Sequence, residues 1–196
     1  MRTGKPVRGV GINDVPGCDK RIAYRWRDMI RRTDNRDLEH FQFTHLYEGC
    51  TLDPRWIYLS AFKEWIETFD DWENKVIDKD IVIPNNKVYG PDTCLMVSPS
   101  VSSFFTTKSC KSDLPQGIDT AKGQTPKGKP YRATCKFDRR THFGGYHATV
   151  EEAQGSFKTM KVGFLEVLIE RETCPKVKTA LQNIYETKDS PEIPWW

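Results

Sequence analysis

The strongest constraint on the fold is a strict alternation of apolar and polar side chains in residues 130–137, PYRATCKF. This period of two predicts a strand with one buried and one polar face, and DRRT predicts a turn into a second strand, HFGGYH. Thr149 and Glu152 then form a capping-box pattern at the start of a helix. The apolar stripe of that helix consists of Ala153, Phe157, Met160, Phe164 and Leu168. The sequence therefore predicts a small sheet packed on one helix.

Two further helices are predicted in the N-terminal half of the chain. Residues 21–32, RIAYRWRDMIRR, bring Ile22, Trp26 and Met29 to one helical face and leave arginines on the others. Residues 60–69, SAFKEWIETF, repeat the helical spacing behind Ser60, whose residue type is typical of a helix N-cap. We expect the acidic, aromatic-rich connection between them to be irregular.

Residues 75–105 predict two strands and a short helix. KVIDKDIVIP (75–84) is rich in Val and Ile, and TCLMVS (93–98) is a short apolar run, so both favour strands. The Asn, Gly and Pro residues between them are typical of a loop. Ser98 and Pro99 have the residue types of an N-cap and a first helical position.

A segment rich in Gly, Ser, Pro and Lys, residues 106–129, predicts a linker and loop. We therefore expect two domains, residues 1–107 and residues 108–196. A chain of 196 residues is long enough for two small cores. Residues 177–185 predict a last amphipathic helix, and SPEIPWW a docked or disordered tail.

No apolar stretch approaches the roughly 20 residues of a membrane span, and the first residues lack the apolar centre of a secretory signal. We therefore expect a soluble, intracellular protein without a membrane partner. The 6 cysteines form no Cys-x-x-Cys pair, so neither a zinc ribbon nor a redox motif is supported. We expect them to be reduced and mostly buried, with disulfides as the alternative if the chain is secreted.

Charge is segregated along the chain although the net charge is only +3. Residues 1–33 carry nine Lys or Arg against three acids, 34–80 carry five against twelve, and 108–140 carry nine against three. Two basic blocks around an acidic one are suited to a protein that grips a polyanion and holds a cation beside it. The alternative is that these charges only solvate ordinary surfaces.

The residues around 77–94, IDKDIVIPNNKVYGPDTC, offer oxygen atoms that a divalent cation prefers. Mg²⁺ is commonly held by one or two carboxylates together with a substrate phosphate. Asp78 and Asp80 end an apolar run, and Ser102 or Ser103 follows on the short helix. These groups indicate either a metal site for phosphodiester hydrolysis or a solvated surface hairpin.

Several segments resemble a known family in their order and spacing. CTLDPRW, IDKDI and NKVYGPDTCLMVSPSV together resemble the ββα-metal core (His-Me finger) of HNH endonucleases, in the variant found in phage-encoded homing endonucleases. LPQGI and YRATCKF followed by FGGYHATVEEA resemble the Apetala-like (ERF-type) DNA-binding domain that often follows such a core. The resemblance spans residues 8–185 and implies three strands that lie on DNA, with a supporting helix.

The resemblance implies roles for individual residues. Asp78 corresponds to the metal-binding aspartate of the first strand, and Lys79 stands where the family has its general-base histidine. A lysine suits a phosphate contact better than a base, so Asp80 is the substitute for water activation. Ser102 corresponds to the second metal-binding position, and Thr93 to the central asparagine. The implied cofactor is Mg²⁺ or Mn²⁺.

Two sets of basic residues are candidates for DNA contact. The polar strand face and its turn carry Arg132, Lys136, Arg139 and Arg140, which a strand ribbon can bring to a major groove. The first predicted helix carries Arg25, Arg27, Arg31 and Arg32, which suit phosphate contacts. For both sets the alternative is a solvated surface. His40, His45, His142 and His147 are not expected to be metal ligands.

We therefore expect an α+β protein with an HNH-like core followed by a small three-stranded sheet packed on one helix. The resemblance favours a site-specific, metal-dependent endonuclease of homing type that hydrolyses double-stranded DNA as a monomer or homodimer. If the gene is phage-encoded, the bacterial cytoplasm is its location. The alternative is a catalytically degenerate DNA-binding protein that keeps the nuclease fold as a scaffold. A protein-interaction module built on the acidic block is a third interpretation.

Overall fold

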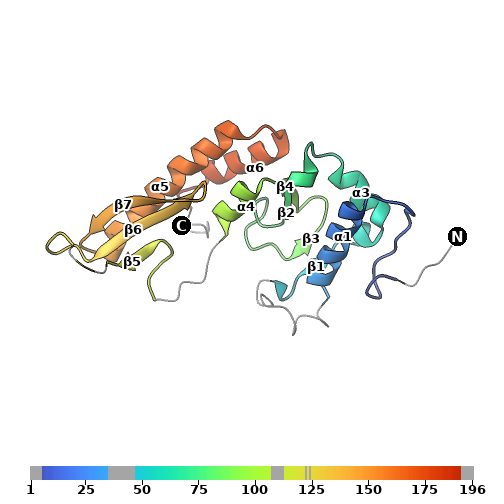
Figure 1. Ribbon diagram of the computed structural model, residues 1–196, viewed down its shortest axis with the longest axis horizontal. Helices are drawn as coiled ribbons and strands as arrows, with labels where there is room; N and C mark the ends of the chain where they lie inside the picture. The colour runs from blue at the N-terminus through green and yellow to red at the C-terminus, as the bar shows by residue number, and fades with distance from the viewer. Residues whose placement is uncertain (1–5, 35–46, 107–112, 122, 124, 191–196) are drawn as a thin grey trace. The chain divides into compact units, whose positions relative to one another are not determined.

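The computed structural model describes residues 6–34, 47–106, 113–121, 123 and 125–190. The chain has a mixed α and β architecture and divides into two compact units, Met1–Val97 and Ser98–Trp196 (Figure 1). We call these the N-terminal and C-terminal units and describe each by itself.

The N-terminal unit combines short strands with helices. In chain order its elements are α1 (Lys20–Arg32), β1 (Thr51–Leu52), the 3₁₀ turn η2 (Pro54–Ile57), α3 (Leu59–Ile66), the 3₁₀ turn η3 (Trp72–Asn74), β2 (Val76–Asp78), β3 (Val88–Tyr89) and β4 (Leu95–Val97). β1 pairs with β3 in parallel, and β2 pairs with β4 antiparallel. The connection before α3 is thus less irregular than predicted, because it contains β1 and η2.

Aromatic side chains form the core of the N-terminal unit. Trp26 of α1 is fully buried and donates its indole N–H to the carbonyl of Trp56, at 2.8 Å. The Trp56 ring makes edge contacts with Phe62 and Trp65, with centroids 5.3 and 4.6 Å apart. These contacts fix α1 against η2 and α3, and they confirm the apolar stripe predicted for residues 21–32.

The predicted N-cap at Ser60 is wrong. α3 begins at Leu59, two residues before the start that an N-cap at Ser60 implies, and Tyr58 at the cap position makes no side-chain hydrogen bond. Asp14 supplies the missing acceptor from a distant segment: its carboxylate receives the Ser60 backbone N–H at 2.9 Å and the Ser60 hydroxyl at 2.5 Å. A carboxylate satisfies the unpaired N–H groups of a helix start as well as a local serine does.

The strand predicted for residues 75–84 is much shorter in the structure. β2 pairs with β4 only from Val76 to Asp78, with Asp78 opposite Leu95. Beyond that point the Asp78 carboxylate accepts the backbone N–H of Asp80 at 3.0 Å and of Ile81 at 3.2 Å. An aspartate that binds its own following backbone favours a turn over continued pairing, so the strand ends there.

The C-terminal unit is a sheet packed on a helix. Its elements are α4 (Pro99–Phe105), β5 (Ile118–Thr120), β6 (Tyr131–Phe137), β7 (Arg140–His147), α5 (Val150–Arg171) and α6 (Pro175–Glu186). The sheet has the antiparallel order β5-β6-β7, and α5 packs against all three strands (Figure 1). The predicted three-stranded sheet with one supporting helix is therefore present.

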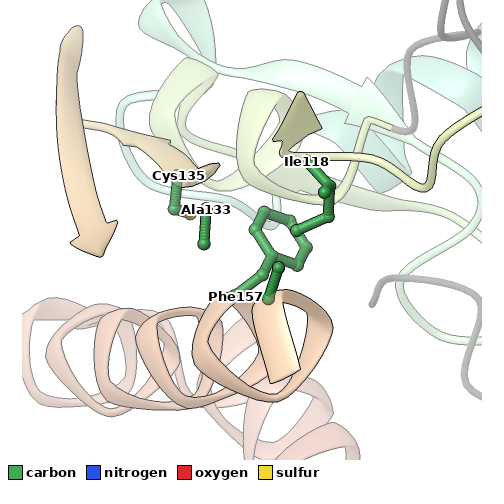
Figure 2. Close-up of a cluster of buried hydrophobic side chains, with 5 residues drawn as sticks. Ile118, Ala133, Cys135 and Phe157 are labelled. Atoms are coloured by element: carbon green, nitrogen blue, oxygen red, sulfur yellow. The ribbon is translucent and has the colours of Figure 1, made fainter. Parts of the chain in front are cut away.

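The inner face of this sheet is the buried half of the predicted alternation. Ala133 and Cys135 of β6 and Ile118 of β5 pack with Ala153 and Phe157 of α5. Figure 2 shows the Phe157 ring rising from the helix toward the strands. Arg132, Thr134 and Lys136 consequently face away from α5.

The start of α5 has the predicted cap. Thr149 Oγ1 accepts the N–H of Glu152, and the Glu152 carboxylate accepts the N–H of Ala148. The apolar stripe is also as predicted, with Met160 and Phe164 partly buried, but it contains an unpredicted member. Lys161 is only 3% exposed.

The units divide earlier than the boundary predicted near residue 108. The division falls between Val97 and Ser98, so α4 belongs to the C-terminal unit. Ser98 and Pro99 begin this helix as predicted, since Ser98 Oγ accepts the N–H of Val101. Phe104 explains the assignment, because its ring contacts Phe137 of β6 with centroids 6.2 Å apart.

Five cysteines lie in the described part of the chain and all are free thiols; Cys50, Cys94 and Cys135 are buried. Cys110 and most of the tail, residues 191–196, lie outside the described residues. Among the described helices, none has the length and apolarity to cross a membrane.

Two glycines of the C-terminal unit should respond oppositely to alanine. Gly117 has φ +78°, and an added Cβ would meet the Phe157 ring at 2.3 Å and the Thr134 carbonyl at 2.7 Å. Gly117→Ala should therefore lower the free energy of unfolding by about 2–4 kcal/mol. Gly155 lies in α5 with open space around it, so Gly155→Ala should raise that free energy by about 0.5–1 kcal/mol. Urea denaturation measures both, and equal effects would contradict the packing described for Gly117.

Candidate functional site

The predicted catalytic residues form a closed network at the end of β2. Lys79 Nζ lies 2.7 and 3.0 Å from the two carboxylate oxygens of Asp80 and also donates to the carbonyl of Asn86 at 2.7 Å. The Lys79 side chain is only 11% exposed. The ammonium group is thus held inside the turn by three oxygen atoms and is not presented to a phosphate.

Asn86 holds the same loop from the other side. Its amide donates to the carbonyls of Lys79 and Val88, at 2.9 and 2.6 Å, and its Oδ1 accepts the Val88 N–H at 3.0 Å. The side chain is buried. Sequence reasoning missed this residue, although an Asn-Asn pair after a proline is a turn signal that marks it as a candidate.

This arrangement does not fit a divalent cation. Both oxygens of Asp80 contact the Lys79 ammonium, and one oxygen of Asp78 accepts two backbone N–H groups. A divalent cation needs several oxygen ligands turned toward one point. Across the described residues, no three His, Cys, Asp or Glu side chains gather in a group that could hold a metal ion. The Lys79 ammonium group thus contacts the Asp80 oxygen atoms that were predicted to serve a metal ion or to activate water.

Two residues inferred from the resemblance have other surroundings. Thr93 Oγ1 donates to the carbonyl of Val88 at 2.7 Å, so it supports the same loop as Asn86. Ser102 lies in α4 of the C-terminal unit, whereas Asp78 belongs to the N-terminal unit. A metal site shared by Ser102 and Asp78 therefore stays a prediction.

Three of the four α1 arginines that were predicted to contact DNA have contacts inside the N-terminal unit. Arg25 donates to the carbonyls of Lys75 and Glu73, at 2.5 and 2.7 Å. Arg31 and Arg32 both pair with Asp28, at 2.5 and 2.6 Å. Arg27 is exposed and makes no such contact with the described residues. This helix therefore offers less free positive charge than its composition suggests.

The outer face of the β5-β6-β7 sheet carries the other predicted cations. Arg132 forms a two-pronged pair with Asp119 of the neighbouring strand, at 3.0 and 2.9 Å, and remains partly exposed. Asp119 raises the pKa of Arg132 through this hydrogen bond. Lys136 lies opposite Thr141, is exposed, and has no ion pair within the described residues. Arg132 is thus held in place by the sheet, while Lys136 is available to a ligand.

Two aromatic residues complete this outer face. Phe143 lies opposite Thr134, and Tyr146 lies opposite Arg132, so the pairing register places both rings among the cations. Phe143 is 59% exposed, and its ring meets the Tyr146 ring edge-on with centroids 5.0 Å apart. Sequence reasoning missed both, because the register of β7 depends on a bulge at Ala133 and Thr134 that no local pattern reveals.

The hairpin between β6 and β7 presents two more predicted arginines. Asp138 and Arg139 form a two-residue turn and both have positive φ, 49° and 63°. Such turns favour Asn or Gly, so an arginine at the tip is a strained choice. Arg139 and the next residue, Arg140, are exposed. Asp138 pairs with Arg171 of α5, which leaves both arginines without an ion pair in the described part of the chain.

The two histidines that the structure describes, His142 and His147, belong to β7. His142 is on the inner side of β7, where its ring contacts Phe137 and Phe164 with centroids 6.4 and 4.6 Å apart. His147 Nε2 lies 3.1 Å from the carbonyl of Gly144. His40 and His45 lie outside the described residues.

Comparison with protein families, curated proteins and solved structures finds no match to this chain. Its function therefore has to be inferred from its own residues.

The loop network can be tested through stability. Asn86→Ala removes three hydrogen bonds at a buried position and should lower the free energy of unfolding of the N-terminal unit by about 2–4 kcal/mol. The control, Asn74→Ala, removes one exposed hydrogen bond to Asp71 and should cost less than about 1 kcal/mol. Denaturant titration followed by tryptophan fluorescence suits this aromatic core. A cost for Asn86→Ala no larger than that of the control would contradict the network.

Proposed function

We propose that this chain binds double-stranded DNA through the outer face of the β5-β6-β7 sheet and the adjoining turn, here called the sheet face. Its residues are Arg132, Lys136, Arg139, Arg140, Phe143 and Tyr146. The observation that carries the proposal is a set of exposed cations without ion pairs among the described residues, next to the exposed ring of Phe143 and the partly exposed ring of Tyr146. They lie on a sheet whose other face is covered by α5.

The dimensions of the sheet suit a groove of DNA. A two-stranded ribbon fits the major groove, where side chains reach base edges and the groove walls carry phosphates. β6 and β7 pair over their whole length, from Tyr131 opposite His147 to Phe137 opposite Arg140. The hairpin tip thus brings Arg139 and Arg140 to one end of a continuous ribbon, where phosphate contact is favoured.

The side chains on this face divide into two chemical roles. Lys136, Arg139 and Arg140 are exposed point charges suited to phosphates, which provide affinity that depends on salt. Arg132 has its guanidinium oriented by Asp119, and such a held fork suits a base edge. The exposed ring of Phe143 suits apolar contact with a thymine methyl group.

Endonuclease activity is the alternative candidate function. It is supported by the antiparallel pairing of β2 with β4, by the position of Asp78 at the end of β2, and by the short helix α4 that follows β4 in the chain. The contact of Lys79 with both oxygens of Asp80 speaks against a ready metal site. The DNA-binding proposal does not depend on this chemistry.

Arg139→Gly separates binding from stability. Glycine relieves the positive φ of residue 139, so the variant should raise the free energy of unfolding by about 1 kcal/mol. The same variant should weaken duplex binding and reduce the slope of log K against log salt by about 1, because one phosphate contact is lost. Fluorescence anisotropy with a labelled duplex at several salt concentrations measures the slope.

The matched control is Lys158→Gln, which removes a cation from the exposed side of α5, where Lys158 pairs with Asp189. It should leave the salt slope unchanged. Equal losses in the two variants would show that binding follows total charge and would contradict a sheet-face interface.

A plasmid cleavage assay distinguishes DNA binding alone from endonuclease activity. Supercoiled plasmid is incubated with wild-type protein and with Asp78→Ala in Mg²⁺ or Mn²⁺, and relaxed circles are counted on a gel. Because Lys79 holds Asp80, we expect wild-type protein to bind the plasmid without producing more relaxed circles than Asp78→Ala does. Metal-dependent nicking by the wild type that Asp78→Ala abolishes would instead favour the endonuclease.

A further inference from the structure

The C-terminal unit contains a cavity of about 400 Å³ beside the buried lysine of α5. Its walls come from α4, the end of β6 with its turn, and α5. Phe104, Phe137 and Phe157 supply the apolar wall of the cavity, and Cys135 of β6 also lines it. Figure 2 shows Cys135 on its strand and the Phe157 ring on α5. This volume lies within the range of small-molecule sites, which is about 300–1,000 Å³.

Lys161 is the polar group of this cavity. Its side chain comes from α5 and is 3% exposed, so the ammonium group is almost wholly removed from bulk water. Nζ donates one hydrogen bond to the carbonyl of Phe104 and lies 3.9 Å from the centroid of the Phe104 ring. An ammonium has three N–H donors, so the one acceptor found for it among the described residues leaves donor capacity unused.

No carboxylate among the described residues pairs with Lys161. Asp138, the acid that lines the cavity, is paired with Arg171 at 2.5 Å. Burial lowers the pKa of Lys161 to about 8, because an ammonium without a counter-ion is unfavourable in an apolar site. Lys136 and Arg139 also line the cavity, so cations outnumber acids among its charged lining residues.

From the cavity, its aromatic wall and the unneutralised ammonium, we propose that the C-terminal unit binds a small aromatic carboxylate, with the carboxylate on Lys161 Nζ and the ring among Phe104, Phe137 and Phe157. The carboxylate supplies acceptors that the described part of the chain does not, and a charged partner gives a strong hydrogen bond at a buried site. The flat apolar body matches the three rings. The cavity shares Lys136 and Arg139 with the sheet face, but the proposed ligand contacts are to Lys161 and the three phenylalanine rings.

Isothermal titration calorimetry with benzoate and 2-naphthoate at physiological salt tests the proposal on the full chain. At least one acid should bind saturably, and the neutral analogue of that acid, benzyl alcohol or 2-naphthalenemethanol, should bind at least about tenfold more weakly, since it lacks the charge. Absence of saturable binding by both acids would overturn the proposal. Equal affinity for the acid and its alcohol would overturn the role of Lys161.

Lys161→Met replaces the lysine with an apolar side chain of similar length and so removes the charge. It should weaken binding of the acid by at least about tenfold, whereas the exposed control Lys158→Met on the same helix should leave the affinity unchanged. Unchanged affinity in Lys161→Met would place the ligand elsewhere and overturn the proposal.

A measurement on the wild type alone covers the case in which Lys161→Met does not fold. In ¹H–¹⁵N correlation spectra, saturation with the acid should shift the amide signals of Cys135, Phe157 and Lys161, which surround the cavity. Shifts confined to residues outside the cavity lining would contradict the site. No DNA is present in any of these experiments, so their outcome is separate from that of the DNA-binding proposal.

Discussion

Burial of one sheet face against α5 is the constraint on which the C-terminal unit depends. Ala133 and Cys135 pack on Phe157, and the period of two along β6 then turns Arg132, Thr134 and Lys136 outward. Pairing with β7 adds Phe143 and Tyr146 to the same outer face. The charged and aromatic surface that we propose for DNA is therefore a direct consequence of how the core is packed.

The N-terminal unit uses its charges differently, since many of the charged side chains that the structure describes there are bound within the unit. Lys79 is held by Asp80 and Asn86, and α1 directs Arg25 onto backbone carbonyls and Arg31 onto Asp28. Paired charges stabilise a loop or a helix surface, but they offer little attraction to a phosphate or a metal ion. This contrast between the units is why the proposed function rests on the sheet face.

Periodicity predicted the helices α1 and α5 and the strand β6 well, because their burial follows one local repeat. It failed where a hydrogen bond from a side chain to the backbone decides where a helix begins or a strand ends. Asp14 caps α3 in place of Ser60, and the Asp78 carboxylate ends β2 early. Of the candidate site residues, Lys136 is exposed as the alternation implied, whereas the pairing of Arg132 with Asp119 depends on strand register. The burial of Lys161, which was not a candidate, depends on tertiary packing. Local sequence patterns carry no information on the strand register or on the tertiary packing.

The most direct test of the account is to map where a DNA duplex contacts the protein by amide hydrogen exchange with and without DNA. The account predicts slower exchange in β6, β7 and the turn at Asp138 and Arg139, with little change in α1 and in the loop from Asp78 to Asn86. Protection centred on α1 or on that loop, with the sheet unchanged, would contradict it.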